Sequence, residues 1–326
     1  MTGDFFLTTW FLEAMRWIYS LTCSISSSGY GSVFLTILIS TIVLRCLTIF
    51  SDIKTRKSSA KMAEVQPEIQ RLQKKYANDP RRFQQEQQKL MKERGVSMWG
   101  SCLPMLITMP LFFCFIAAFR YWGYEMNLRL LVDENAMELF KSFKFLWINN
   151  IWQPDNGLSP VLADGATFLG TAEISKLLYL QEPGVGEKLV EMGLAVTKVY
   201  QGEVSYQLLS NETAIAIYNN AIQPFLDVYK GYNNGWFIMS VLAGGTNFLS
   251  AWLMTKNTPA ANEEAAKSTK WMNYLFPVMS FIFCLSYNAA FAIYWTLTSI
   301  IMIIVNFILN KKFPRTPTVA QESENK

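Results

Sequence analysis

The run WMNYLFPVMSFIFCLSYNAAFAIYWTLTSIIMIIVNFILN, residues 271–310, contains forty residues and no Asp, Glu, Lys or Arg. A helix of that length would cover roughly 60 Å, about twice the hydrocarbon thickness of a bilayer. The polar tripeptide Ser286-Tyr287-Asn288 lies near its middle, so we expect a tight turn there between two membrane-crossing helices. The run therefore predicts an integral membrane protein.

The composition of the 326-residue chain supports this prediction and excludes several chemistries. Hydrophobic residues make up 51% and charged residues 17%, against roughly 25% charged in ordinary globular domains. There is no histidine, which excludes Ser-His-Asp catalysis and His-ligated metal sites. The five cysteines include no CxxC pair, so a disulfide framework is not expected. We predict no catalytic residue, no metal and no cofactor.

Three more apolar segments bring the number of predicted spans to five, with the first at 32–50, the second at 98–120 and the third at 236–255. Residues 1–31 precede them and include the aromatic-rich stretch Asp4–Cys23, which also carries Glu13 and Arg16. Because those charges interrupt the apolar run, we expect an amphipathic helix lying in the outer membrane interface. A sixth span is the alternative interpretation.

Lysine and arginine in the loops predict the orientation of the chain. Residues 51–97 hold twelve Lys/Arg and six Asp/Glu, whereas residues 121–235 hold seven and thirteen. Basic loops stay in the cytoplasm. We therefore place 51–97, the loop 256–270 and the tail 311–326 in the cytoplasm, and the N-terminus and 121–235 outside.

The basic segment 51–97 has the pattern of a helical hairpin. Apolar residues recur every three or four positions up to Tyr76, Asn78-Asp79-Pro80 is typical of a turn and helix restart, and a second apolar stripe includes Phe83 and Leu90. The candidate docking residues on the other faces are Lys74, Lys75, Arg81 and Arg82. A hairpin that only lies near anionic lipid headgroups would have the same charge.

Arg45 is a charge within the first predicted span. A cation at the bilayer centre costs from roughly 2.5 to more than 10 kcal/mol. Its side chain has two open interpretations: it snorkels to the cytoplasmic interface, roughly 8 Å away, or it faces a hydrophilic groove. Thr41 and Thr48 share its face, and other spans add polar residues that include Thr108 and Asn247. No acidic residue occurs within the five spans, so Arg45 would attract anionic groups from another molecule.

Several motifs together resemble the YidC/Oxa/Alb family of membrane protein insertases. The most specific is Gly100–Phe112, in which Pro104 and Pro110 stand six residues apart within a span. The others are Leu44-Arg45, Lys75-Tyr76 in the hairpin, Phe145-Leu146-Trp147 with Pro154-Asp155, Leu242–Leu249, Pro277-Val278-Met279 and Tyr294-Trp295. The resemblance covers roughly residues 5–155 and 236–312, and residues 156–235 are an insert without a recognised counterpart. We expect that insert to be a small folded subdomain.

The resemblance implies an all-α, five-span protein with a client-binding groove that includes Tyr294 and Trp295 beside Arg45, Thr41, Thr48, Thr108 and Asn247. It implies that nascent membrane proteins with acidic outer tails are the clients, in the plasma membrane of a bacterium. Candidate partners are the ribosome or targeting factors, the general secretion translocon and membrane lipids. Binding to DNA is not expected.

Two other functions remain open at this point. One is a small anion transporter that uses Arg45 as its substrate site, which would be expected to show inverted repeats. The other is a scaffold that recruits partners through the basic hairpin.

Overall fold

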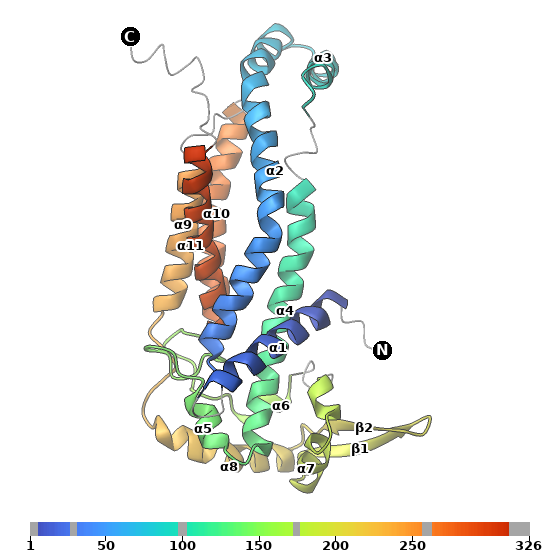
Figure 1. The fold of residues 1–326 in the computed structure, drawn as a ribbon, viewed down its shortest axis with the longest axis vertical. Helices are drawn as coiled ribbons and strands as arrows, with labels where there is room; N and C mark the ends of the chain where they lie inside the picture. Colours follow the sequence, from blue (N-terminus) through green and yellow to red (C-terminus); the bar gives the residue numbers. More distant parts are fainter. Residues whose placement is uncertain (1–5, 27–30, 97–102, 172–176, 256–262, 313–326) are drawn as a thin grey trace. The chain divides into compact units, whose positions relative to one another are not determined.

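The computed structural model describes residues 6–26, 31–96, 103–171, 177–255 and 263–312, most of which are helical (Figure 1). The chain divides into two compact units. Unit 1 comprises residues 1–40, 113–242 and 281–295, and unit 2 comprises residues 41–112, 243–280 and 296–326. Five long helices run through both units: α2 (Val33–Lys75), α4 (Leu103–Val132), α9 (Ile238–Thr255), α10 (Glu263–Ser286) and α11 (Ala289–Lys312).

These five helices coincide with the described parts of the five predicted segments, and several of them extend further. Among the described residues, two helical windows are long and apolar enough to cross a membrane, Val33–Phe50 and Ala289–Ile308. Shorter apolar stretches lie at Ile238–Leu253 and Tyr274–Ser286. The charge-free run breaks where the polar tripeptide lies, because α10 ends at Ser286 and α11 begins at Ala289.

In unit 1, helix α1 (Phe6–Ile25) crosses α4 (Figure 1). The Phe11 ring meets Phe115 edge to face at 5.1 Å, and Tyr19 meets Trp122 at 5.7 Å. The opposite side of α1 exposes large apolar side chains, those of Phe6, Trp10, Trp17 and Leu21. A helix that exposes aromatic and apolar side chains on the side away from its protein contacts fits a position in a membrane interface.

The end of α1 is packed closely against the start of α2, within unit 1. The hydroxyls of Thr22 and Thr36 lie 3.3 Å apart, and the Gly31 N–H donates to Cys23 Sγ at 3.0 Å. A Cβ at Gly31 would lie 2.2 Å from Thr22 Oγ1, so only glycine permits this approach. These contacts therefore fix the start of α2 relative to α1.

The insert 156–235 is folded in its described part, as expected, and it is not purely helical. It contains α6 (Gly165–Leu169), the 3₁₀ helix η3 (Leu178–Gln181), α7 (Val185–Glu191), β1 (Ala195–Tyr200), β2 (Glu203–Leu208) and α8 (Glu212–Val228), and a further helix, α5 (Ala136–Lys141), precedes it. The strands pair antiparallel, with Ala195 opposite Leu208 and Tyr200 opposite Glu203. The Gln181 carboxamide bonds the N–H and C=O of Tyr206, in the way a third strand would. A small β-ribbon thus departs from the predicted all-α fold. Its turn residues, Gln201 and Gly202, both have positive φ, as a two-residue hairpin turn requires.

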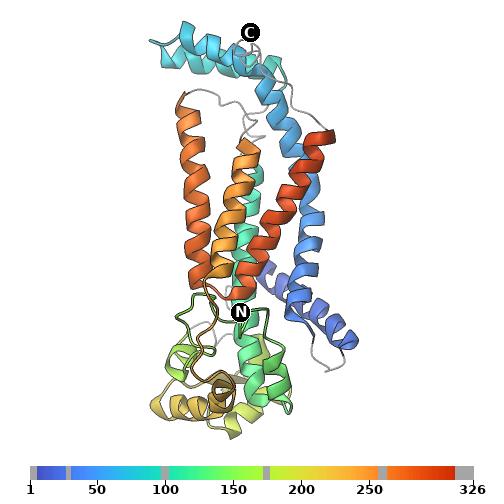
Figure 2. The same ribbon diagram turned by 90° about the vertical axis from the view of Figure 1, so that its left-hand side faces the viewer.

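In unit 2, α2 continues past residue 50 as one helix to Lys75, with Pro67 inside it, and α3 (Pro80–Glu93) folds back beside its end (Figure 2). Val65 and Ile69 are buried with Met91 and Val96, and Phe83 and Leu90 pack against them. Asp79 caps α3 by accepting a hydrogen bond from the Arg82 N–H at 3.1 Å, and Pro80 is the first helical residue. Leu72 is half-buried and lies outside this cluster.

Candidate functional site

Helix α2 has an exposed apolar stripe and a polar side in its span. Large exposed side chains recur at Leu35, Ile39 and Ile42 and continue to Phe50. At 3.6 residues per turn, Arg45 lies about 125° around the helix from the centre of that stripe. The Arg45 side chain is half-buried, and Thr41, on the same side, is fully buried. The exposed stripe therefore fits a lipid-facing surface, and Arg45 points away from its centre.

The immediate surroundings of Arg45 are polar. Thr48 Oγ1 donates to the Arg45 carbonyl at 3.2 Å. Among the side chains that the structure describes, no acidic group forms an ion pair with Arg45. The guanidinium is thus a half-buried cation whose charge is not neutralised within the described chain.

Unit 2 contains further buried polar residues on its other helices. Among the side chains described there, those outside α2 are Ser280 on α10 and Thr296, Ser299 and Asn306 on α11. Asn247 of α9 donates from Nδ2 to Ser280 Oγ at 3.0 Å, and Ser280 Oγ donates to the Phe276 carbonyl at 2.7 Å. Polar side chains inside otherwise apolar helices face protein or water rather than lipid, because lipid offers them no hydrogen bond.

Three of the predicted groove residues are not seen beside Arg45: two pack among aromatic rings of unit 1, and the side chain of the third is not described by the structure. Tyr294 belongs to unit 1, where its ring lies 4.5 Å from Phe115 and 5.6 Å from Phe119. Trp295 meets the Phe291 ring at 5.4 Å in the same unit. Thr108 is in α4, but its side chain lies outside the described part of the structure. Tyr294 therefore packs in an aromatic cluster, which sequence spacing alone did not indicate.

The four predicted docking residues of the hairpin are all exposed. Lys74 and Lys75 end α2, and Arg81 and Arg82 lie in the first turn of α3. The Lys75 ammonium lies 5.2 Å from the centre of the Tyr76 ring, and the Arg82 guanidinium lies 5.5 Å from it. Tyr76 thus gathers two of the four cations at the tip of the hairpin by cation–π contact.

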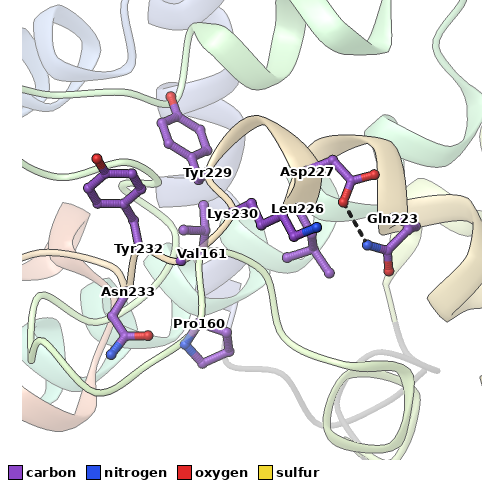
Figure 3. A pocket seen from close by; sticks show the side chains of 10 residues that line it. Pro160, Val161, Gln223, Leu226, Asp227, Tyr229, Lys230, Tyr232 and Asn233 are labelled. Carbon is purple, nitrogen blue, oxygen red and sulfur yellow. Dashed lines mark hydrogen bonds between the residues drawn. The ribbon is translucent and has the colours of Figure 1, made fainter.

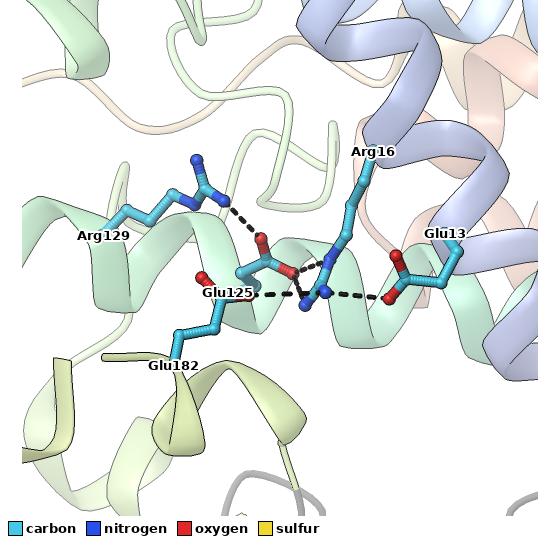
Figure 4. Close-up of polar contacts among 5 residues, drawn as sticks. All are labelled: Glu13, Arg16, Glu125, Arg129 and Glu182. Atoms are coloured by element: carbon cyan, nitrogen blue, oxygen red, sulfur yellow. Dashed lines mark hydrogen bonds and ion pairs between the residues drawn. The ribbon is translucent and has the colours of Figure 1, made fainter. Parts of the chain in front are cut away.

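A second charged site, which sequence reasoning missed, joins three elements of unit 1 (Figure 4). We call Arg16, Glu125 and Arg129 the Glu125 junction. Glu125 of α4 is fully buried and accepts hydrogen bonds from Arg16 Nε at 2.8 Å and Arg16 Nη2 at 2.5 Å. Its other oxygen accepts from Arg129 Nη2 at 2.9 Å. Glu13 and Glu182 add ion pairs to Arg16 at 2.9 and 3.5 Å.

The sequence held a signal for this junction. Glu125 and Arg129 are one helical turn apart at the end of an apolar helix, and Glu13 and Arg16 interrupt an aromatic one. Burial raises the pKa of Glu125, and the guanidiniums of Arg16 and Arg129 oppose that rise. The Arg129 guanidinium also lies 5.0 Å from the centre of the Tyr179 ring, so the insert contacts the junction directly.

Asp155, from the Pro154-Asp155 motif, holds the start of α9. Its Oδ1 accepts from the N–H groups of Trp236 at 2.5 Å and Phe237 at 3.1 Å, and its Oδ2 accepts from that of Met239 at 2.7 Å. A Cβ at Gly235 would lie 1.9 Å from Oδ1, so glycine is required beside it. The motif therefore marks a helix cap and not a binding residue.

A pocket of about 280 Å³ opens at the end of α8 (Figure 3). Pro160, Val161, Tyr229, Lys230 and Tyr232 are among the residues that line it, and Gln223 Nε2 donates to Asp227 Oδ1 at 3.0 Å. None of the predicted groove or docking residues lines it. The pocket belongs to the insert and is separate from the predicted site.

Comparison with known proteins places these features in a family. The family model described as 60Kd inner membrane protein matches residues 25–316. The chain is 30% identical over 221 residues to the membrane protein insertase YidC of Clostridium perfringens, which covers 67% of this chain and 86% of that protein. It is 35% identical over 150 residues to the YidC insertase of Clostridium tetani, covering 46% of this chain and 60% of that protein. A match of 36% over 114 residues links it to the YidC insertase of Oceanobacillus iheyensis, with 34% of this chain and 44% of that protein covered.

These matches confirm the resemblance that the proline, arginine and tryptophan motifs predicted. The relatives are bacterial, and the family description names an inner membrane protein. The matched region includes both Arg45 and the α10–α11 pair. The chain belongs to the YidC/Oxa/Alb family, and it is a membrane protein insertase.

Proposed function

We propose that this insertase moves short polar segments of its clients across the bilayer through a hydrophilic groove that contains Arg45, and releases their apolar helices into lipid. The position of Arg45 on α2 supports this most directly: it is a half-buried cation, away from the exposed stripe, without an acidic partner among the described side chains. Thr41, Thr48 and Asn247 are the nearest candidates for the polar lining, with Thr108, Tyr294 and Trp295 added by the resemblance.

The mechanism follows from electrostatics and burial. A cation in a low-dielectric groove attracts carboxylates in the outgoing tail of a client. The apolar client helix then moves into lipid, because burial of apolar surface is favourable by roughly 25 cal/mol per Å². Neither step makes or breaks a covalent bond, so the proposed activity needs no catalytic residue and no cofactor.

The proposed topology follows the distribution of basic residues. Five helices span the plasma membrane, with the N-terminus outside and the C-terminus in the cytoplasm. Residues 51–97 are then cytoplasmic, and 121–235 with the insert are outside. The exposed aromatic face of α1 supports an interfacial position for residues 1–31.

Charge substitution at Arg45 tests the groove. In a strain depleted of its own insertase, Arg45→Lys is expected to insert a single-span client with an acidic outer tail, and Arg45→Ala to lose most of that insertion, measured by protease protection. A client with an uncharged tail is the matched control, and its insertion should depend less on Arg45. Full insertion of the acidic-tailed client by Arg45→Ala would contradict the groove. It is the result that the scaffold function predicts, because a scaffold does not need the charge of Arg45. Anion uptake into proteoliposomes that depends on Arg45 would favour the transporter.

We also propose that the hairpin contacts the ribosome or a targeting factor. Lys74, Lys75, Arg81 and Arg82 are all exposed at its tip, and the tail 311–326 carries fewer basic residues. Neutralising these four should weaken co-sedimentation of the solubilised protein with ribosomes, and deletion of 313–326 should change it little. The opposite ranking would reject this docking surface. Contact with the general secretion translocon is a further candidate, testable by crosslinking from the same exposed positions.

A further inference from the structure

The buried charge contact between α1 and α4 is made by one carboxylate. Arg16 reaches three acidic residues, but Glu13 and Glu182 have side chains 55% and 42% exposed, whereas that of Glu125 is 1% exposed. Exposed ion pairs contribute little, because water and salt screen them. A buried pair with two hydrogen bonds from one guanidinium is stronger and directional. Glu125 therefore determines where the Arg16 side chain, and with it α1, lies across α4.

The same carboxylate has a second arm that leads to the insert. Glu125 Oε1, which does not bond Arg16, accepts a hydrogen bond from Arg129. The Arg129 guanidinium in turn lies over the Tyr179 ring of η3. A second contact joins the insert to α4: Lys188 Nζ of α7 donates to the carbonyl of Val132, the last residue of α4, at 3.0 Å. The α1 arm and the insert arm use different oxygens of Glu125, so substitutions can separate them.

Fixing α1 has consequences for both of its ends. Its outward side carries the exposed aromatic residues Phe6, Trp10 and Trp17, whose direction is set by the rotation of the helix. Its last turn meets the start of α2 through the Thr22–Thr36 contact. A rotation or slide of α1 would move this aromatic face and displace the first turn of α2.

From this geometry we propose that Glu125 is a positioning residue for insertion: by holding Arg16, it keeps α1 at the angle across α4 at which client segments are inserted. The inference rests on the insertase function and is independent of the Arg45 groove. We assign the junction to the orientation of α1, because a buried ion pair taken as a whole adds little net stability compared with apolar packing. The apolar contacts of α1, such as Phe11 with Phe115, supply the stability.

The test uses the full-length protein in liposomes and two measurements. Insertion of a single-span client is followed as an initial rate by protease protection. The mobility of α1 is followed by a nitroxide at exposed position 21, introduced by Leu21→Cys in a chain whose native cysteines are replaced. Glu125→Gln is expected to slow insertion about tenfold, equivalent to about 1.4 kcal/mol, and to raise the nitroxide mobility.

Two variants serve as matched controls. Glu13→Gln removes an exposed partner of the same arginine, and Arg129→Gln removes the insert arm while Arg16 keeps Glu125. Both should insert at close to the parental rate with parental α1 mobility. Arg16→Gln should behave like Glu125→Gln, and the double variant should be no slower than either, because the two side chains act through one contact.

Several outcomes would overturn the proposal. They are a parental insertion rate for Glu125→Gln, a raised mobility without slower insertion, or an equal slowing by Arg129→Gln. Should Glu125→Gln not fold, Arg16→Gln carries the test, since it leaves Glu125 with Arg129. Insertion by the parent protein is measured first in the same liposomes. Its absence would contradict the insertase function itself.

Discussion

Asn234 and Asn150 exchange two hydrogen bonds across 84 residues of sequence: the Asn150 N–H donates to Asn234 Oδ1 and Asn234 Nδ2 donates to the Asn150 carbonyl, both at 2.8 Å. Asn234 is fully buried, and its Nδ2 also lies within 3.1 Å of the Gln153 carbonyl. Its N–H donates to the Ser159 carbonyl at 2.8 Å. The two chain segments that enter and leave the insert are therefore bonded to each other at its base.

This pairing determines which boundaries a replacement of the insert can have. Replacing all of 156–235 with a Gly/Ser linker removes Asn234 and leaves the buried Asn150 N–H unpaired, which costs about 1–3 kcal/mol for each such group. Replacing only 163–228 keeps both paired segments, and a flexible linker can join their ends. We expect the shorter replacement to insert simple clients, and the longer one to accumulate poorly. Loss of insertion by the shorter replacement at normal abundance would show that the insert takes part in insertion.

Asp155 is expected to be more important for stability than any other cap in unit 1. Asp155→Asn keeps one acceptor oxygen where the carboxylate accepts from several N–H groups, so the midpoint of thermal unfolding in detergent should fall, by the equivalent of at least about 2 kcal/mol. Asp164→Asn is the matched control: Asp164 caps the short helix α6 with one bond to the Thr167 N–H at 2.7 Å. A cap of that kind is worth about 1 kcal/mol. Equal effects of the two substitutions would reject the special role of Asp155.

The hairpin has a small apolar cluster that can be tested separately from its charges. Ile69→Asp places a carboxylate where the side chain is buried with Met91. It should lower the free energy of opening the hairpin by about 3 kcal/mol or more. Hydrogen exchange of α3 amides is the measurement, and it should become faster while α2 between 33 and 50 stays protected. Leu72→Asp is the control, because Leu72 is half-buried outside the cluster. Faster exchange in both variants would mean that the hairpin is held together elsewhere.

The Glu125 junction also predicts a pH dependence. Burial raises the pKa of Glu125 above its ordinary value of 4.5, so the folded protein binds that proton more tightly than the unfolded chain. The associated stability is present below the ordinary value and is lost as the pH rises through the raised one. The groups facing Glu125 are Arg16, Arg129, Glu13, Glu182 and Tyr179, and Tyr179, with its pKa raised to about 12 by burial, stays protonated in this range.

We therefore expect the parent to gain thermal stability relative to Glu125→Gln as the pH falls from neutral towards about 4.5. The difference between the two unfolding midpoints is the measurement, because it cancels the titration of all other groups. A parent that loses stability relative to the Gln variant on acidification would show that the two arginines outweigh burial at this site.

Local sequence patterns determined the helices, the breaks between them and the family. The absence of charge over 271–310, the Asp79-Pro80 restart and the spacing of Val65 and Ile69 depend on neighbours within one or two turns. Such patterns can be read from a single sequence, because a helix brings residues three and four apart to one face. The same periodicity placed Arg45 on one face with Thr41 and Thr48, and the structure then showed that this face lies away from the exposed stripe.

Only the tertiary structure decided which distant residues meet. Arg16 and Glu125 are 109 residues apart, and Asp155 caps a helix that begins more than eighty residues later. No periodicity predicts such pairs, because they depend on how whole elements pack. The way the elements of the insert pack was equally hidden: Ala214, Tyr218, Ile222 and Phe225 of α8 recur at helical spacing, but which elements cover that face depends on the folded chain. What orients α1 across α4 is therefore a single buried carboxylate, whose partners become visible only once the chain is folded.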